Sequence, residues 1–190
     1  AGLPPPFFRF AMPAADATTD PELPRRLAVR LRGPLPGAQG QASFQPELSH
    51  GRHFHQPPPW TRRAAVMLLL YPSTAGWLLP LVLRPAHLSK HAGQIGLPGG
   101  AIEAGESIEA AALRELEEEL GVSPERVELL GPLSPLNLYV TDFTVLPWVG
   151  VTRSRPEFRP DPGEVDQLIE VPLHSLCDDA CRTRLPVKRG

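Results

Sequence analysis

The sequence predicts an α+β fold with a mixed β-sheet. Short apolar runs bounded by turn residues are mixed with amphipathic helical patterns, and there is no regular β-α-β alternation along the chain. The chain has 190 residues, 42 % hydrophobic and 21 % charged, which is the balance of one globular domain of ordinary size. We therefore expect a few helices packed on a sheet whose strands run in both directions.

The first 60 residues form a proline-rich segment, with 12 of the 25 prolines of the chain. Such punctuation favours irregular structure. One helix is expected there, from about Pro21 to Arg32, because Pro24 is compatible with a first helical turn. We expect residues 1–60 to pack on, or extend, a domain formed by residues 61–190.

The strand signals begin after Trp60. Two apolar runs, 64–70 and 77–84, flank the turn signal at 72–76 and predict a β-hairpin. A short third strand is expected at 94–97, directly before a pair of glycines. Further strands are expected at 127–133, 143–151 and 168–171, followed by a helix or turn at 172–177.

A helix is predicted from Ile108 to Leu120. Ser107 is a favourable N-cap, and Gly121 is a favourable residue just past the C-terminus. Apolar residues recur at helical spacing, so that one stripe can face a core: Ile108, Ala111, Ala112, Leu116 and Leu120.

Three glutamates of this helix also share one face. Glu115, Glu118 and Glu119 stand at i, i+3 and i+4, where like charges destabilise a helix by roughly 0.2–0.5 kcal/mol per pair. A solvated acidic surface is the simpler explanation of such a pattern. Convergent carboxylates are also the hard oxygen ligands that Mg²⁺ and Mn²⁺ prefer, and a bound cation would remove the repulsion.

The segment from Gly100 to Val122 follows the pattern G-x5-E-x7-R-E-U-x-E-E-x-G-U, where U is a bulky aliphatic residue. This pattern resembles the Nudix box. The resemblance implies an α/β/α sandwich with a mixed sheet and a catalytic loop–helix. It also implies hydrolysis of nucleoside diphosphates linked to another group, with Mg²⁺ or Mn²⁺ as cofactor.

The same resemblance assigns roles to individual residues. It implies metal ligation by Glu115, Glu118 and Glu119, with one of the last two, or a carboxylate outside the box, as general base. Arg114 would orient a glutamate through a paired hydrogen bond. Glu164 is a further carboxylate candidate near the site, although an ordinary surface charge is the simpler explanation.

The resemblance also implies roles for residues that precede the helix. Glu106 would hold the loop before the helix, and Gly99 and Gly100 would allow close approach of the backbone.

The substrate is suggested by residues 84–100, R-P-A-H-L-S-K-H-A-G-Q-I-G-L-P-G-G. This run resembles the second signature of coenzyme A pyrophosphatases, with five residues in register: Arg84, Gly93, Pro98, Gly99 and Gly100. Ser89 stands where that signature has a second arginine. The resemblance implies cleavage of coenzyme A or an acyl-coenzyme A to 3′,5′-ADP and 4′-phosphopantetheine or its acyl form. The predicted substrate-binding residues are Arg84, Lys90, Gly93, Gly99 and Gly100, and Lys90 is equally well explained as an ordinary surface cation.

Two other functions stay open. The enzyme could act on ADP-ribose, a dinucleotide or another nucleoside diphosphate derivative, which the loss of arginine at position 89 allows. Alternatively, the chain could be a Nudix-fold module that binds a nucleotide without cutting it.

The net charge and the cysteine content indicate which kinds of partner and which environment to expect. A net charge of −2 gives no reason to expect nucleic-acid or membrane binding, and a small-molecule nucleotide is the expected partner. The two cysteines are expected to be free thiols in a reducing cytoplasm. Monomer and homodimer are both compatible with the sequence.

Overall fold

A computed structural model describes residues 19–44, 57–88, 91–138 and 141–181 of the chain. The elements follow in this order: α1 (Leu23–Leu31), α2 (Gly37–Gln41), β1 (Arg62–Ser73), β2 (Gly76–Leu83), β3 (Ile95–Gly96), β4 (Gly99–Ala101), α3 (Ile108–Leu120), β5 (Glu128–Pro132), β6 (Leu136–Leu138), β7 (Phe143–Val151), β8 (Gln167–Pro172) and α4 (Leu173–Cys177). Single 3₁₀ turns occur at Ala42–Phe44, Pro124–Arg126 and Asp179–Cys181. None of the helices in these ranges has the length and apolarity needed to cross a bilayer.

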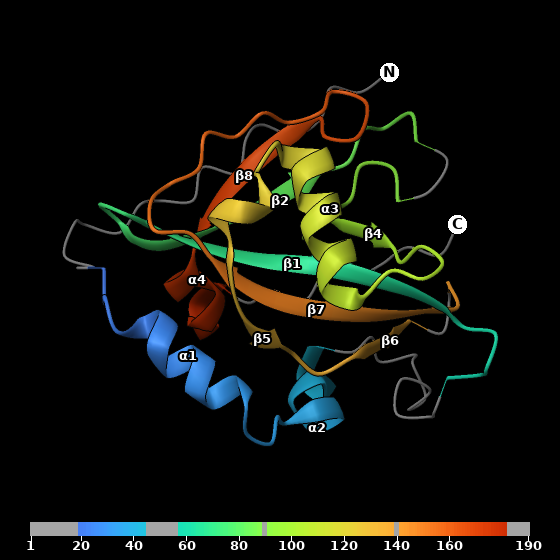
Figure 1. The fold of residues 1–190 in the computed structure, drawn as a ribbon, viewed down its shortest axis with the longest axis horizontal. Helices are drawn as coiled ribbons and strands as arrows, with labels where there is room; N and C mark the ends of the chain where they lie inside the picture. Colours follow the sequence, from blue (N-terminus) through green and yellow to red (C-terminus); the bar gives the residue numbers. More distant parts are fainter. Residues whose placement is uncertain (1–18, 45–56, 89–90, 139–140, 182–190) are drawn as a thin grey trace.

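The strands of the described residues form one mixed sheet in the order β3-β2-β1-β7-β5 (Figure 1). The long strand β1 lies parallel to β7 over nine residue pairs, and the other pairings are antiparallel. On its other edge β1 pairs first with β4 and then with β2. The predicted α+β class with a mixed sheet is confirmed.

The two faces of the sheet are covered by different helices, which gives three layers (Figure 1). Because side chains alternate along a strand, β1 supplies both cores. Ala65, Met67, Leu69 and Tyr71 pack with the apolar stripe of α3, whereas Leu70 packs in a second core that includes residues of α1 and α4.

Helix α3 has the predicted bounds and the predicted caps. The side chain of Ser107 accepts a hydrogen bond from the amide of Ala110 at 3.2 Å, and Gly121 adopts a left-handed conformation with φ of 68°. The buried residues Ala111, Ala112, Leu116 and Leu120 fix one face of the helix against the sheet. Glu119 is buried with these residues, and the carboxylate of Glu115 lies against Gly100 of β4, so the acidic side of the helix borders the core beside this strand.

Three elements differ from the prediction. Strand β4 is a Gly-Gly-Ala segment with no periodicity of its own, and it forms because it pairs with residues 64–66 of β1. Strand β6 forms through its pairing with β7. Helix α2 follows a proline-rich stretch that was expected to be irregular, and a contact across the chain holds it, since the amide of Gly37 donates to the hydroxyl of Ser134 at 3.1 Å.

Residues 152–166 connect β7 to β8 and are called the strap below. The strap crosses the C-terminal end of α3 (Figure 1). The amides of Arg159 and Asp161 donate to the carbonyls of Leu120 and Glu119, at 2.8 and 3.0 Å. Since the last carbonyls of a helix lack partners within the helix, the strap satisfies groups that would otherwise stay unpaired.

Candidate active site

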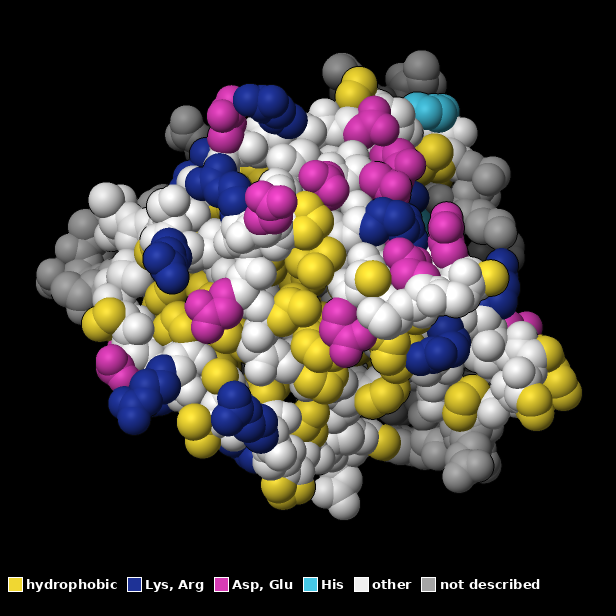
Figure 2. Space-filling model, viewed as in Figure 1, with side chains coloured by type: hydrophobic (Ala, Val, Ile, Leu, Met, Phe, Trp, Pro, Cys, Tyr) yellow, Lys and Arg dark blue, Asp and Glu magenta, His cyan; other side chains and the backbone are white. Residues whose placement is uncertain are grey.

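Three carboxylates from two distant parts of the chain meet beside α3. Glu115 and Glu119 come from α3, and Glu164 comes from the strap. Each offers one oxygen, and these oxygens all lie within 4.8 Å of one another. Figure 2 shows acidic side chains gathered over the α3 side of the molecule. These three residues are called the carboxylate cluster below.

Glu119 is the buried member of the cluster, with no exposed surface. One carboxylate oxygen accepts a hydrogen bond from the Nη1 group of Arg84 at 3.1 Å, and the other accepts one from the amide of Gly99 at 3.2 Å. Burial raises the pKa of Glu119 to about 7, although Arg84 and the Gly99 amide act in the opposite direction. The neighbouring charges of Glu115 and Glu164 also raise this pKa.

Arg114 joins the glutamates of the loop and the helix. Its Nε and Nη2 groups donate to the two oxygens of Glu106, at 2.9 and 3.1 Å, in a bidentate pair. Its Nη1 group donates to both Glu115 and Glu118, at 2.9 and 2.8 Å. The bond with Arg114 lowers the pKa of Glu106, while burial raises the pKa of Glu115 despite the same arginine. Arg114 thus fixes the loop before α3 to the acidic face of the helix.

The glycine pair permits close contact at two places. A Cβ atom added to Gly100 would lie 2.4 Å from Oε1 of Glu115, and one added to Gly99 would lie 2.3 Å from the carbonyl oxygen of Ala65. Both distances are shorter than a normal van der Waals contact. Position 99 requires glycine because the added atom would meet backbone, whereas at position 100 it would displace the Glu115 carboxylate. The Gly99 amide can therefore reach Glu119 while β4 stays paired with β1.

The structure separates Glu118 from the carboxylate cluster. The side chain of Glu118 is 55 % exposed and is turned toward Arg114, whereas Glu164 lies with Glu115 and Glu119. The sequence singled out Glu164 only as a candidate. The one local feature of the sequence that could have indicated this position is the apolar Val165. Its side chain is buried in the core that includes α3, and this places Glu164 close to the helix.

Of the predicted substrate-binding residues, three lie at the carboxylate cluster and one lies in the turn that follows β2. Arg84 contacts Glu119, and Gly99 and Gly100 border the cluster. Gly93 has a φ of 67°, and its amide donates to the carbonyl of Arg84 at 3.1 Å, so it closes the turn that follows β2. Lys90 lies outside the described residues.

The cluster suits a small divalent cation. Its ligand atoms are hard oxygens. Burial is the main cause of the raised pKa of Glu115 and of Glu119, and the charges of neighbouring carboxylates raise both pKa values further. Oxygens that share one Mg²⁺ at about 2.1 Å lie at most about 4.2 Å apart. The present separations, within 4.8 Å, thus need only a small contraction.

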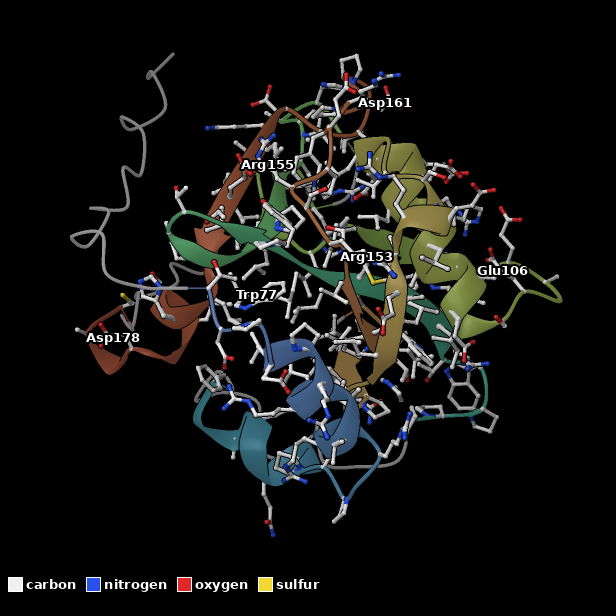
Figure 3. All side chains as sticks on the ribbon, turned by 60° about the vertical axis from the view of Figure 1, so that its left-hand side comes forward. Trp77, Glu106, Arg153, Arg155, Asp161 and Asp178 are labelled. Carbon is white, nitrogen blue, oxygen red and sulfur yellow. The ribbon has the colours of Figure 1, made fainter. Side chains whose placement is uncertain are left out.

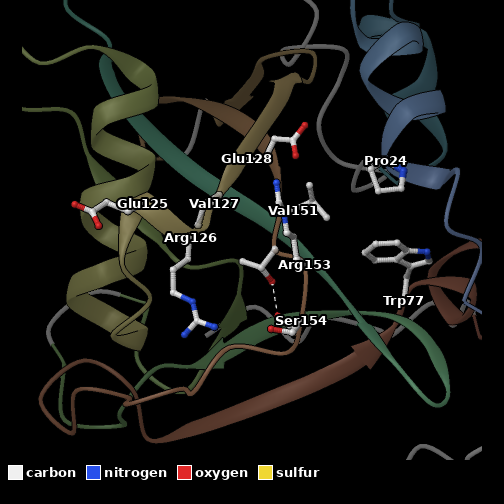
Figure 4. A pocket seen from close by; sticks show the side chains of 10 residues that line it. Pro24, Trp77, Glu125, Arg126, Val127, Glu128, Val151, Arg153 and Ser154 are labelled. Atoms are coloured by element: carbon white, nitrogen blue, oxygen red, sulfur yellow. Dashed lines mark hydrogen bonds between the residues drawn. The ribbon is translucent and has the colours of Figure 1, made fainter.

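A separate hollow of about 660 Å³ lies elsewhere on the molecule (Figure 4). Trp77, Arg126, Val151 and Arg153 are among the residues that line it, and none of the carboxylate cluster does. The acidic cluster, rather than this hollow, brings together the residues that the sequence singled out.

Comparison with known proteins agrees with this geometry. A family model described as NUDIX domain matches residues 61–188. The "Uncharacterized Nudix hydrolase NudL" of Pectobacterium atrosepticum is 43 % identical over 113 residues, which are 59 % of this chain and 58 % of that protein. The protein of the same name from Citrobacter koseri is 42 % identical with the same coverage. The chain thus spans 58 % of the length of the curated relatives it matches.

Solved structures show the same fold. The Nudix hydrolase RenU of M. smegmatis superposes with a TM-score of 0.50 at 24 % identity, over 62 % of this chain and 74 % of that one. The Ap4A hydrolase of C. elegans superposes with a TM-score of 0.51 at 17 % identity, over 60 % and 82 %. At these identities the likeness concerns the fold alone. Because the family model covers well over half of the residues, and the complete box lies on the loop and helix described above, the chain belongs to the Nudix family.

Proposed function

We propose that the protein hydrolyses the diphosphate bond of coenzyme A or an acyl-coenzyme A with Mg²⁺ or Mn²⁺, giving 3′,5′-ADP and 4′-phosphopantetheine or its acyl form. The observation that carries the hydrolytic part is the meeting of Glu115, Glu119 and Glu164 beside the glycine turn in a Nudix domain. The relatives at 42–43 % identity are named Nudix hydrolases, which supports hydrolysis. The choice of coenzyme A depends on the signature-like run at 84–100.

In this proposal the three residues of the carboxylate cluster hold the cation. When bound, Mg²⁺ or Mn²⁺ neutralises the diphosphate oxygens and lowers the pKa of a water molecule. Glu119 enters the site from a fully buried position, so its orientation is fixed by the Arg84 and Gly99 bonds before any ligand arrives. Arg114 orients Glu115 in the same manner.

Glu118 has a different role in this proposal, that of proton acceptor. Its carboxylate stands outside the carboxylate cluster, is 55 % exposed, and shares the Nη1 group of Arg114 with Glu115. A general base needs access to water and a position near the reacting centre. The exposure of Glu118 and its shared bond with Glu115 to Arg114 support this role. Arg114 and Glu106 are then positioning residues, since they act through the glutamates and the loop.

The substrate-binding side of the proposal depends on Arg84. One of its terminal nitrogens is bonded to Glu119, but its Nε group is buried and has no partner among the described residues. An unpaired buried donor is costly, and a phosphate oxygen would satisfy it. Gly93 donates to the carbonyl of Arg84, Gly99 donates to the glutamate that Arg84 contacts, and Gly100 borders Glu115. Lys90 is kept as a proposed contact on the sequence signature alone.

Hydrolysis assays test the proposal. Coenzyme A, acetyl-coenzyme A, ADP-ribose and a dinucleotide are incubated separately with Mg²⁺, with Mn²⁺ and with chelator, and the products are identified by mass. We expect metal-dependent release of 3′,5′-ADP from the coenzyme A substrates, well above turnover of the other two. Glu119→Gln should nearly abolish this turnover, whereas the matched exposed variant Glu157→Gln, 75 % exposed, should retain it.

Other outcomes would redirect the proposal. Preferred cleavage of ADP-ribose or the dinucleotide would leave the hydrolytic site standing and would discard coenzyme A, with Ser89 as the residue to examine. Tight nucleotide binding without cleavage of any substrate would favour the non-catalytic binding module.

A further inference from the structure

The position of Glu164 is set by the strap rather than by a bond of its own side chain. Among the described residues, the Glu164 carboxylate makes no hydrogen bond or ion pair, and only its amide is bonded, to the carbonyl of Asp161 at 3.0 Å. Whether Glu164 reaches the carboxylate cluster therefore depends on what holds the strap in place.

The end of the strap that carries Glu164 is held by backbone bonds. It is attached to α3 through the amide of Asp161, and the amide of Asp166 donates to the carbonyl of Leu83 at 2.8 Å. Val165 is buried against α3 between these two points.

The end nearer β7 is held by side chains. Arg155 forms a bidentate pair with Glu170 of β8, with Nε at 2.7 Å from one oxygen and Nη2 at 2.9 Å from the other. The hydroxyl of the buried Tyr71 donates to the same carboxylate at 2.8 Å. Figure 3 shows Arg155 beside β8 and Asp161 beside the end of α3.

An aromatic contact extends the side-chain attachment to the middle of the strap. The ring of Phe158, midway along the strap, meets the ring of Tyr71 edge-on at 5.4 Å between centroids. The guanidinium of Arg155 lies 5.2 Å from the centre of the same ring. Arg155, Tyr71 and Phe158 are thus packed together, and the arginine lowers the pKa of Glu170, so the pair stays charged near neutrality.

We propose that Arg155, Glu170 and Tyr71 are positioning residues that lock the strap so that Glu164 meets Glu115 and Glu119. The inference deepens the proposed function, because it requires the carboxylate cluster to bind a divalent cation. It predicts that metal affinity depends on the pair formed by Arg155, at the far end of the strap, and Glu170 of β8, although neither side chain belongs to the carboxylate cluster.

The test measures Mn²⁺ affinity from the electron paramagnetic resonance signal of free Mn²⁺, well below the melting temperature of each variant. Arg155→Gln is expected to weaken binding about tenfold, and Glu170→Gln, which breaks the same pair from β8, should act in the same direction. Arg159→Gln is the matched control, because Arg159 is also a strap arginine paired with a glutamate, but both side chains are 75 % exposed. It should leave the affinity unchanged.

A double-mutant cycle separates positioning from general destabilisation. In a Glu164→Gln background, Arg155→Gln should cause no further loss of Mn²⁺ affinity, because the ligand that it positions is already gone. An equal loss with and without Glu164, or a lower melting temperature with unchanged affinity, would overturn the inference.

Hydrogen exchange provides a second readout that needs no metal. The amides of Val165 and Asp166 should exchange faster in Arg155→Gln than in the wild type or in Arg159→Gln. Unchanged exchange would refute the anchor even if the protein is an active hydrolase. Faster exchange in a protein that binds no Mn²⁺ would retain the anchor of the strap, but would refute both its role in metal binding and the proposed function.

Discussion

Replacement of Glu119 by glutamine should change how stability depends on pH. Glu119 is fully buried, and burial raises its pKa from 4.5 to about 7. A carboxyl whose pKa is higher in the folded state favours folding when it is protonated, so it does not reduce the free energy of unfolding at low pH. Its ionisation reduces the free energy of unfolding as the pH rises above the unfolded pKa, and this loss is complete above about pH 7.

The size of this effect follows from the shift. A rise from 4.5 to about 7 corresponds to about 3 kcal/mol, and most of this, about 2–3 kcal/mol, develops between pH 5 and pH 8. Glutamine keeps the shape of the side chain but carries no charge. Whatever the substitution costs at pH 5, the stability of Glu119→Gln relative to the wild type should therefore improve by about 2–3 kcal/mol at pH 8. For a domain of this size, that equals roughly 5–10 °C in melting temperature.

The assay is thermal unfolding of both proteins in chelator at pH 5 and pH 8, with Glu157→Gln as the control for loss of one exposed negative charge. Mn²⁺ added at pH 8 should raise the melting temperature of the wild type and leave Glu119→Gln unchanged, since a ligand stabilises only the state that binds it. A variant-minus-wild-type difference that is the same at both pH values would refute the reasoning.

Three further predictions follow from the same geometry. Glu164→Gln should weaken Mn²⁺ binding about tenfold, because it removes a metal ligand. Glu118→Gln should lower turnover at saturating metal by about 10²-fold or more, with little change in Mn²⁺ affinity, because it removes the general base. The reverse result would make Glu118 the metal ligand and Glu164 the general base. Gly100→Ala should displace the Glu115 carboxylate, because the added Cβ atom would lie 2.4 Å from it. Metal titration should then show a lower affinity, and calorimetry a lower melting temperature. Arg114→Lys removes the bidentate bond to the loop carboxylate, so it should lower kcat about tenfold or more while the far-ultraviolet circular dichroism stays unchanged.

The local parts of the site can be predicted from the sequence. The bounds and caps of α3 follow from a 3.6-residue apolar period between a serine and a glycine, and these signals act within one helix. The bounds of β7 follow similarly from an apolar run. The spacing of Glu106, Arg114 and Glu115 was also readable, and the structure brings these residues together within one loop and helix.

Which carboxylates meet cannot be predicted in this way, because it depends on how distant segments pack together. Glu118 and Glu119 are neighbours in the chain, but the helix directs one toward Arg114 in solvent and buries the other against Arg84 and Gly99. Glu164 lies 45 residues after Glu119, and it reaches the cluster because the strap crosses the end of α3. No local pattern encodes such a meeting, because it depends on strand order and on backbone bonds between segments that are far apart in the sequence.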